Sequence, residues 1–305
     1  LGDGVHQFTT TLTDAAGNES PQSAALPLTV DTAAPAAPTG VTVTDDVAPV
    51  TGAIAANGAS NDNKPTFAGA AGSAEAGSTI TVMDGATVLG TAVVAADGSW
   101  SVTPTTALAD GAHSITTRAT DAAGNVSPVS PALALTVDTA APAAPAAPTS
   151  TAPSTNDNTP GIHIGVGLTD TPSLYVDGVK VPATYDPVTG TLTPTTPLGD
   201  GVHQFTTTLT DAAGNVSPVS PALALTVDTA APAAPAAPTS TAPSTNDNTP
   251  GIHIGVGLTD TPSLYVDGVK VPATYDPVTG TLTPTTPLGD GVHQFTTTLT
   301  DAAGN

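Results

Sequence analysis

An exact internal repeat constrains this chain more than any other feature. Residues 120–215 and 210–305 are identical letter for letter, at an offset of 90 residues. The segment LGDGVHQFTTTLTDAAGN occurs three times and a looser copy occurs once, at 1–18, 198–215, 288–305 and 108–125. Repetition at a fixed period is typical of arrays of similar units. A period of this length fits one small β-domain per repeat.

Local composition predicts that each repeat is built from short β-strands. Aromatic residues make up only 3% of the chain, and no stretch has the Leu-, Glu- and Lys-rich pattern of a long helix. Runs of Thr and Val broken by Gly, Pro, Asn and Asp are typical of strands joined by tight turns. In the 90-residue repeat we expect strands at 161–167, 173–176, 179–185, 191–193, 202–210 and 222–227. This pattern predicts an all-β fold of tandem immunoglobulin-like antiparallel β-sandwiches in an extended array.

Alternation within these strands predicts which side chains form the core. GIHIGVG is expected to place Ile162, Ile164 and Val166 on one face and to leave His163 in solvent. The longest strand groups four side chains on one face, namely His203, Phe205, Thr207 and Leu209. The first complete repeat is longer, because TGVTVTDDVAPVTGAIAANGAS at 39–60 supplies an additional strand at Val41–Thr44. Its Trp100 and Val102 are predicted to belong to the core.

The repeat positions predict four segments along the chain. Residues 1–31 are expected to be the C-terminal fragment of one repeat, 32–138 a complete longer repeat, 139–228 a complete repeat, and 229–305 a repeat without its last strand. The chain starts and stops in mid-pattern, so we expect it to be an excerpt of a longer protein. In the two 90-residue repeats, the Pro-rich segment after the Val-Asp-Thr motif is expected to serve as linker and first edge strand.

The charge balance narrows the classes of partner. There are 26 acidic residues against 4 basic ones, which gives a formal net charge of −22. Nucleic-acid binding needs clustered Lys and Arg, so no nucleic-acid partner is expected. The chain has no cysteine and no apolar run of about 20 residues, so neither disulfides nor membrane insertion of this segment are predicted.

Several motifs together resemble a known family. L-x-D-G-x-H, TDAAGN and L-T-V-D-T-A-A-P, followed by N-D-N-x-P, resemble the bacterial Ig-like repeats of giant biofilm-associated surface adhesins of Gram-negative bacteria, of the RTX type exported by type I secretion. The resemblance implies a stalk on the bacterial cell surface that supports cell adhesion and biofilm formation. It also implies calcium at or near the domain junctions. Neighbouring repeats are the implied partners, together with other cells or surfaces through regions outside this chain.

Acidic loops are the candidate calcium sites. In a seven-strand sandwich, the NDN loop, the L-x-D-G loop and the V-D-T exit emerge at one pole, and the DAAGN turn of the next repeat faces that pole. Calcium takes 6–8 oxygen ligands from carboxylates, Asn side chains and backbone carbonyls. The predicted ligands are Asp62, Asp110, Asp138, Asp157, Asp200, Asp228, Asp247 and Asp290. The alternative is that Asp and Asn only shape turns, and this interpretation is favoured for DAAGN and for Asp177-Gly178.

The histidines are interpreted as structural. His6, His113, His203 and His293 hold the position at which Ig-type sandwiches carry a tyrosine that bonds back across a corner. No cysteine nucleophile and no G-x-S-x-G motif is present, so the chain is not expected to be an enzyme. Two alternatives stay open. One is a module that binds glycan or host protein through Tyr175 and Tyr185, and the other is an accessory spacer of a secreted enzyme.

Overall fold

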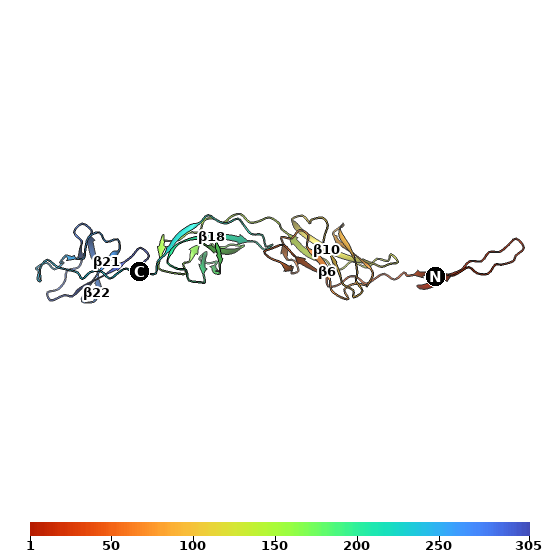
Figure 1. The fold of residues 1–305 in the computed structure, drawn as a ribbon, viewed down its shortest axis with the longest axis horizontal. Coiled ribbons are helices and arrows are strands. Elements are labelled where there is room, and N and C mark those ends of the chain that lie inside the picture. The colour runs from red at the N-terminus through yellow and green to blue at the C-terminus, as the bar shows by residue number, and fades with distance from the viewer. The chain divides into compact units, whose positions relative to one another are not determined.

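The computed structural model describes residues 1–305, and it consists of strands, turns and loops (Figure 1). No helix long and apolar enough to cross a membrane is found. By contacts the chain divides into two units. The first contains 1–142 together with 210–216, and the second contains 143–209 and 217–305. The predicted all-β fold of tandem Ig-like antiparallel sandwiches is confirmed.

In the first unit, the repeat at 32–138 is a sandwich of two sheets, represented by β10 and β6 in Figure 1. One sheet has the order β5-β11-β10-β7-β8. Its strands are β5 (Ala59–Ser60), β7 (Thr79–Asp84), β8 (Thr87–Val93), β10 (Gly111–Thr120) and β11 (Leu133–Val137). The other has the order β4-β3-β6-β9, with β3 (Thr42–Asp45), β4 (Gly52–Ala53), β6 (Thr66–Gly69) and β9 (Trp100–Val102). Only β5 and β11 pair in parallel.

The two sheets of this repeat enclose one apolar core. Phe67, Ile80 and Ile115 are fully or almost fully buried, and Trp100 and Val102 are each 5% exposed, as predicted. Gly69 lies against the indole of Trp100, its partner on the neighbouring strand, and a Cβ at this position would overlap the ring. Close approach of a large aromatic ring therefore explains the glycine at the end of β6.

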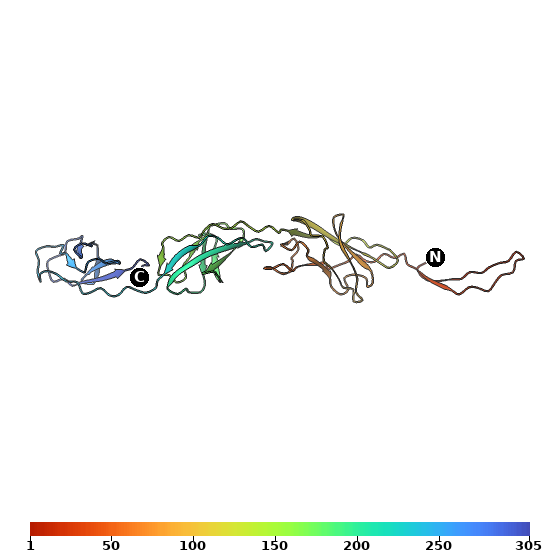
Figure 2. The same ribbon diagram turned by 45° about the horizontal axis from the view of Figure 1, so that its top comes forward.

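The repeat at 139–228 keeps the same arrangement with fewer strands. One sheet has the order β12-β19-β18-β14-β15, and the long strand β18 is seen well in Figure 2. Its strands are β12 (Ser154–Thr155), β14 (Thr171–Val176), β15 (Val179–Val181), β18 (Gly201–Thr210) and β19 (Leu223–Val227). The other sheet has the order β13-β17-β16, with β13 (Ile162–His163), β16 (Ala183–Asp186) and β17 (Thr191–Pro194).

Three details of this repeat differ from the sequence prediction. Val166 is 61% exposed instead of core, because the strand ends at His163 and the chain turns away. The single strand predicted at 179–185 is two strands, β15 and β16, which belong to different sheets. Pro182 separates them and has no N–H for a continuous ladder. The Pro-rich segment pairs only near its end, through β12 and a bridge at Thr149.

The last repeat has the same sequence but lacks the partner of its longest strand. Its sheets have the orders β22-β21-β25 and β20-β24-β23. The strands are β20 (Ile252–His253), β21 (Thr261–Val266), β22 (Val269–Val271), β23 (Ala273–Asp276), β24 (Thr281–Pro284) and β25 (Phe295–Thr300). β25 has 6 residues where β18 has 10. Residues 292–294 are not strand, while β25 stays paired with β21, so the open edge changes only the start of the segment that corresponds to β18.

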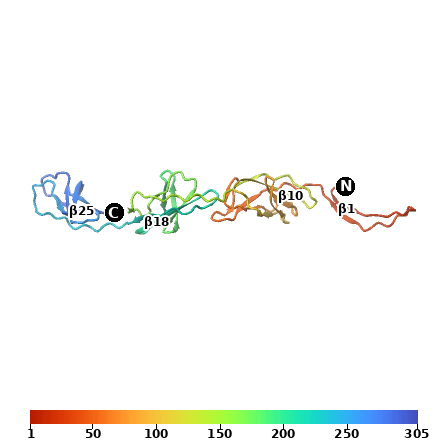
Figure 3. The same ribbon diagram turned by 90° about the horizontal axis from the view of Figure 1, so that it is seen from above.

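The N-terminal segment is a single hairpin, with β1 (Gly4–Phe8) labelled in Figure 3 and β2 (Leu26–Val30) beside it. The register pairs Gly4 with Val30, as Gly201 pairs with Val227 in the complete repeat. Leu26 and Leu28 are 65% and 53% exposed, because no second sheet covers them. Residues 1–31 therefore form a hairpin that corresponds to β18 and β19 of the complete repeat.

Candidate functional site

Three loops of the repeat at 32–138 meet at one end of its sandwich. The parallel pairing of β5 with β11 brings the NDN loop beside the V-D-T exit, and the Asp138 amide donates to the Ser60 carbonyl at 2.9 Å. The Leu108 amide donates to the Asn63 carbonyl at 2.8 Å. Asp110 Oδ1 accepts the amide of Thr139 at 3.0 Å. The loops that carry Asp62, Asp110 and Asp138 thus meet at this end.

The repeat at 139–228 builds the same end from the same motifs. The Asp228 amide donates to the Thr155 carbonyl at 2.9 Å, and Asp200 Oδ1 accepts the amide of Thr229 at 2.9 Å. The Leu198 amide donates to the Asn158 carbonyl, next to Asp157, at 2.8 Å. In the last repeat, Asp247 and Asp290 lie around one cavity. In each repeat the loops that carry the predicted aspartates therefore lie at the same end.

The DAAGN turn is locked by its own first and last residues. In the turn at 121–125, Asp121 Oδ1 accepts the amides of Ala123 and Asn125, and Asp121 Oδ2 accepts Asn125 Nδ2 at 2.9 Å. The Asn125 side chain is the main reason why the pKa of Asp121 lies below its usual 3.8. Such bonds are those of an Asp that shapes a turn.

The same asparagine has a second partner in the preceding repeat. Asn125 Nδ2 donates to the Asp31 carbonyl at 3.0 Å, and Asn215 Nδ2 donates to the Asp138 carbonyl at 2.8 Å, both within the first unit. Within the second unit, Asn305 Nδ2 donates to the Asp228 carbonyl at 2.6 Å. The DAAGN turns at 121–125, 211–215 and 301–305 are thus each tied to the V-D-T exit of the repeat before them. We name this contact the Asn–Asp junction.

The longer repeat adds contacts to its junction inside the first unit. The Asn61 amide donates to the Ala213 carbonyl at 3.0 Å, and Ala213 is 3% exposed. A Cβ on Gly214 would lie 3.1 Å from the Val50 Cβ. Val50 belongs to the insertion that makes this repeat longer. In the second unit the DAAGN turn at 301–305 has fewer such contacts. One of them is the hydrogen bond from Ser154 Oγ to the Ala302 carbonyl, at 2.7 Å.

Seven of the eight predicted calcium ligands, all except Asp290, accept local hydrogen bonds. Asp62 Oδ1 accepts the Lys64 amide at 2.7 Å, and Asp138 Oδ1 accepts the Ala140 amide at 3.0 Å. No group of three His, Asp or Glu side chains converges as metal ligands anywhere in the chain. At the junction of Asp138 and Asn215, Asn61 Oδ1 is nevertheless buried without a hydrogen-bond partner. These carboxylate and amide oxygens are of the type that calcium prefers. In this structure, however, the carboxylates bind nearby backbone amides and shape turns.

Each histidine at the start of the longest strand lies between two acceptors. His203 Nε2 lies 2.8 Å from the Gly199 carbonyl and Nδ1 lies 2.7 Å from Asp177 Oδ2. The carbonyl contact is the corner predicted from sequence. The aspartate partner was not predicted, because Asp177-Gly178 was interpreted only as a hairpin turn. The sequence signal is an Asp-Gly turn that precedes the histidine by 26 residues at Asp177 and Asp267, and by 29 residues at Asp84.

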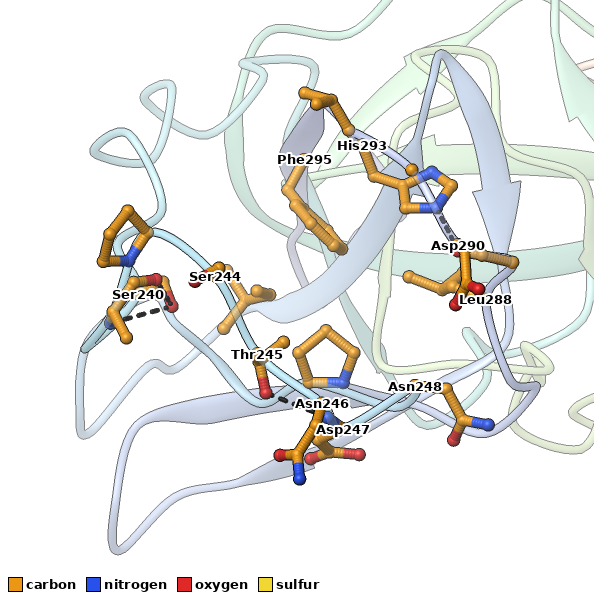
Figure 4. A pocket seen from close by; sticks show the side chains of 17 residues that line it. Ser240, Ser244, Thr245, Asn246, Asp247, Asn248, Leu288, Asp290, His293 and Phe295 are labelled. Carbon is orange, nitrogen blue, oxygen red and sulfur yellow. Dashed lines mark hydrogen bonds between the residues drawn. The ribbon is translucent and has the colours of Figure 1, made fainter.

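A cavity of about 540 Å³ marks the open edge of the last repeat. Ser244 and Thr245 line one side and His293 and Phe295 the other, and the Phe295 side chain faces the segment of Ser244 and Thr245 (Figure 4). In the preceding repeat the corresponding segments are β12 and β18, and β19 runs between them. The cavity therefore occupies the place of a β19-like strand.

The exposed aromatic surface needed for the ligand-binding alternative is not found at Tyr185. Its hydroxyl donates to the Gly165 carbonyl at 2.8 Å, and its ring packs against the core of Ile162, Leu174 and Phe205. Tyr175 is partly buried. His163 and His253 are exposed, as predicted.

Several solved structures are similar to parts of this chain. Fibronectin(III)-like modules of Clostridium thermocellum CbhA are 16% identical, with 61% of this chain and 94% of that chain covered and a TM-score of 0.40. The BSP domain of a biofilm associated protein is 22% identical, with 58% and 29% covered and a TM-score of 0.22. A tetra-tandem repeat in the extending region of a large adhesion protein is 19% identical, with 98% and 81% covered and a TM-score of 0.23.

Sequence comparison is more specific. No curated protein sequence matches the chain. The family described as Bacterial Ig-like domain matches residues 38–139 and 147–229, which is more than half of the chain. The two matched segments fall on the two complete sandwiches described above. The chain therefore belongs to the bacterial Ig-like domain family.

Proposed function

We propose that these repeats are the stalk or spacer of a bacterial cell-surface adhesin, outside the cell, where they support cell adhesion and biofilm formation. One observation carries the proposal. The Asn–Asp junction recurs three times, at Asp31, Asp138 and Asp228, with the same atoms in each case. A contact that recurs between successive repeats suits a stalk, because each repeat is then oriented by the repeat before it.

The neighbouring repeats of the same chain are the partners in this proposal. The proposed domains are 1–31, 32–138, 139–228 and 229–305, so that each V-D-T motif closes one repeat. The RTX-type parent and its export by type I secretion are part of the same proposal. So is attachment to other cells or surfaces through regions outside this chain.

We propose further that calcium binds at the poles and stiffens them. The support is chemical. The net charge is −22, each pole gathers carboxylates and carbonyls, and Asn61 Oδ1 is buried without a partner. Asp62 and Asp138 would supply carboxylate oxygens at the junction of Asp138 and Asn215. Isothermal titration of chelator-treated chain with calcium tests this part, and absence of binding heat at millimolar calcium would remove it without affecting the stalk.

A competition assay tests the stalk proposal. The soluble chain is added to bacteria that adhere to a surface through the protein that carries these repeats. A stalk holds its binding region elsewhere, so an excess of the chain leaves adhesion unchanged, and the labelled chain does not bind the surface. Saturable binding of the chain, with inhibition of adhesion, would instead favour the ligand-binding module.

A deletion gives a positive test of the same proposal. Removing residues 139–228 joins Asp138 to Thr229, and the sequence that follows is that of the deleted repeat, so the junction is rebuilt. The stalk predicts that this deletion shortens the reach of the parent protein by one repeat and leaves folding intact. Loss of all adhesion to purified ligand, with normal display, would contradict it.

A further inference from the structure

A histidine bridge recurs in every complete sandwich and in the last repeat. His113 Nδ1 lies 2.7 Å from Asp84 Oδ2 and its Nε2 lies 2.7 Å from the Ala109 carbonyl. The corresponding pairs for His203 and His293 have distances of 2.7 and 2.8 Å. Each ring thus links the hairpin turn after one strand to the loop that carries the L-x-D-G motif.

Neither partner of the ring can donate a proton. A carboxylate and a backbone carbonyl are both acceptors, whereas a neutral imidazole has one N–H and one bare nitrogen. Both contacts are hydrogen bonds only when the ring carries two protons. In the neutral ring one nitrogen has no hydrogen, so its lone pair would face an acceptor oxygen at 2.7 to 2.8 Å and be repelled by it. The observed geometry therefore belongs to the imidazolium form.

The surroundings of the ring agree with this protonation state. The aspartate of the hairpin turn is the charged group that acts on it, and the residue opposite His113 on β11 is Leu135. Asp110, in the preceding loop, points its carboxylate at Thr139 instead. Burial lowers the pKa of His113, but its hydrogen bonds with Asp84 and the Ala109 carbonyl outweigh that effect and raise the pKa above 6.5.

The other two copies behave alike. The pKa of His203 is raised above 6.5 mainly by Asp177, and that of His293 mainly by the Gly289 carbonyl, followed by Asp267. The N-terminal hairpin offers a contrast. His6 Nε2 contacts the Gly2 carbonyl at 2.6 Å, and no aspartate faces its Nδ1. The aspartate half of the bridge is thus contributed by the part of a sandwich that residues 1–31 do not contain.

We propose that these histidines form a pH-sensitive latch, in which the imidazolium ring holds the L-x-D-G loop against the sandwich and the neutral ring releases it. The carboxylate retains the remaining N–H, so the contact to the loop carbonyl is the one that is lost. The loop then loosens around Asp110, whose Oδ1 holds the Thr139 amide at the exit of the repeat. The latch goes beyond the proposed stalk function, and it operates whether or not a cation binds at the pole.

The first complete repeat allows a test in the full chain, because its loop sequence ALADGAH is unique. Amide hydrogen exchange of residues 107–113 is measured by mass spectrometry at pH 5.5 to 8.5, with chelator present and intrinsic rates corrected. Nitrogen chemical shifts of the imidazole report the charge of His113 in the same samples. The latch predicts that protection falls as the ring loses its proton, roughly tenfold for each unit by which folding raises the pKa. Constant protection while the ring titrates would overturn it.

Asp84→Asn provides the decisive variant. The amide keeps an oxygen for the Ser114 amide, which donates to Asp84 Oδ1 at 3.1 Å. Its NH₂ group donates to a neutral Nδ1, so Nε2–H remains free to donate to the Ala109 carbonyl. We expect the loop to stay protected at pH 8.5 in this variant. The matched control is Asp97→Asn, a turn aspartate bonded to Ser99 and not to histidine, which keeps the original pH dependence. An Asp84→Asn chain that loses protection like the control would contradict the latch.

Discussion

Asn215 Nδ2 donates a hydrogen bond to the backbone carbonyl of Asp138, a residue 77 positions earlier in the chain. The other hydrogen of the same NH₂ group is used inside the turn, on Asp211 Oδ2 at 2.9 Å. One side chain therefore closes its own turn and holds the exit of the previous repeat. The same double role recurs at Asn125 and Asn305. Locking the turn fixes the direction in which the second donor points.

The first prediction concerns this asparagine. Asn215→Ala removes a hydrogen bond worth about 1 kcal/mol between repeats. We expect the Asn61 amide, which donates to the Ala213 carbonyl, to exchange several times faster with solvent. Hydrogen exchange measures this, since GASNDNK is unique in the chain. Asn18→Ala is the control, because Asn18 makes the same turn bond to Asp14 with no second partner. An unchanged Asn61 amide would show that Asn215 does not couple the repeats.

The second prediction uses two phenylalanines in identical sequence. Phe205 is fully buried under β19, whereas Phe295 is only partly buried at the open edge. Phe205→Ala should cost about 3–5 kcal/mol of the free energy of unfolding of its repeat, and Phe295→Ala clearly less. Urea unfolding followed by NMR resolves the two repeats once each carries its own substitution. Equal costs would mean that the missing neighbour strand does not matter for the core.

The third prediction concerns a chain that is extended by a strand equivalent to β19, next to β25. Extending the chain after Asn305 by the sequence of residues 216–228 supplies the LALTV strand found in β19. The strand should fill the cavity beside Phe295 and convert residues 291–294 to strand, as in β18. Increased protection of the His293 amide region measures this. Replacing LALTV by LALTD in the extension is the control, since Val227 is fully buried. Equal protection by both extensions would refute the assignment of the cavity.

The fourth prediction is a limited pH window of stability. The pKa of Asp121 is lowered in the folded state, mainly by the Asn125 side chain, so its contribution is present above pH 3.8 and is lost as the pH falls through the folded value. His203 has the opposite sign. Its pKa is raised, so its contribution is present below pH 6.5 and is lost as the pH rises through the folded value.

Urea midpoints from pH 2 to 9 should therefore be highest between about pH 4 and 6.5. Asp121→Asn should reduce the loss of the urea midpoint below about pH 4 and leave its decrease above about pH 6.5 unchanged. A midpoint that keeps rising from pH 6 to 9 would contradict the assignment of His203 as imidazolium in the folded state.

Much of the fold is visible in the sequence because the repeat fixes the domain size and the strands alternate. Phe205, Trp100 and the order of turns follow from that alternation. Val166 was misplaced because alternation alone does not show where a strand ends. The division at Pro182 was missed because a chain that changes sheets keeps the same local pattern on either side.

The candidate site was predictable in position and not in chemistry. Loop order placed Asp62, Asp110 and Asp138 at one pole, since strand direction alone decides that. The partners of Asn215 and His203 depend on contacts between residues far apart in sequence, namely with Asp138 and Asp177. Turn propensity already explains why Asn and Asp occur in these motifs. The local sequence therefore does not reveal that the same side chains also bind residues far away in the chain.

The proposal that the Asn–Asp junction limits the motion between successive repeats is tested most directly by a distance distribution. The chain has no cysteine, so spin labels are placed selectively at Val88→Cys and Val179→Cys, which are 57% and 65% exposed. Pulsed electron paramagnetic resonance then reports the spread of distances between two neighbouring repeats. We predict a single narrow distribution that broadens on Asn215→Ala. A broad distribution in the unsubstituted chain, or a width that Asn215→Ala leaves unchanged, would contradict the claim.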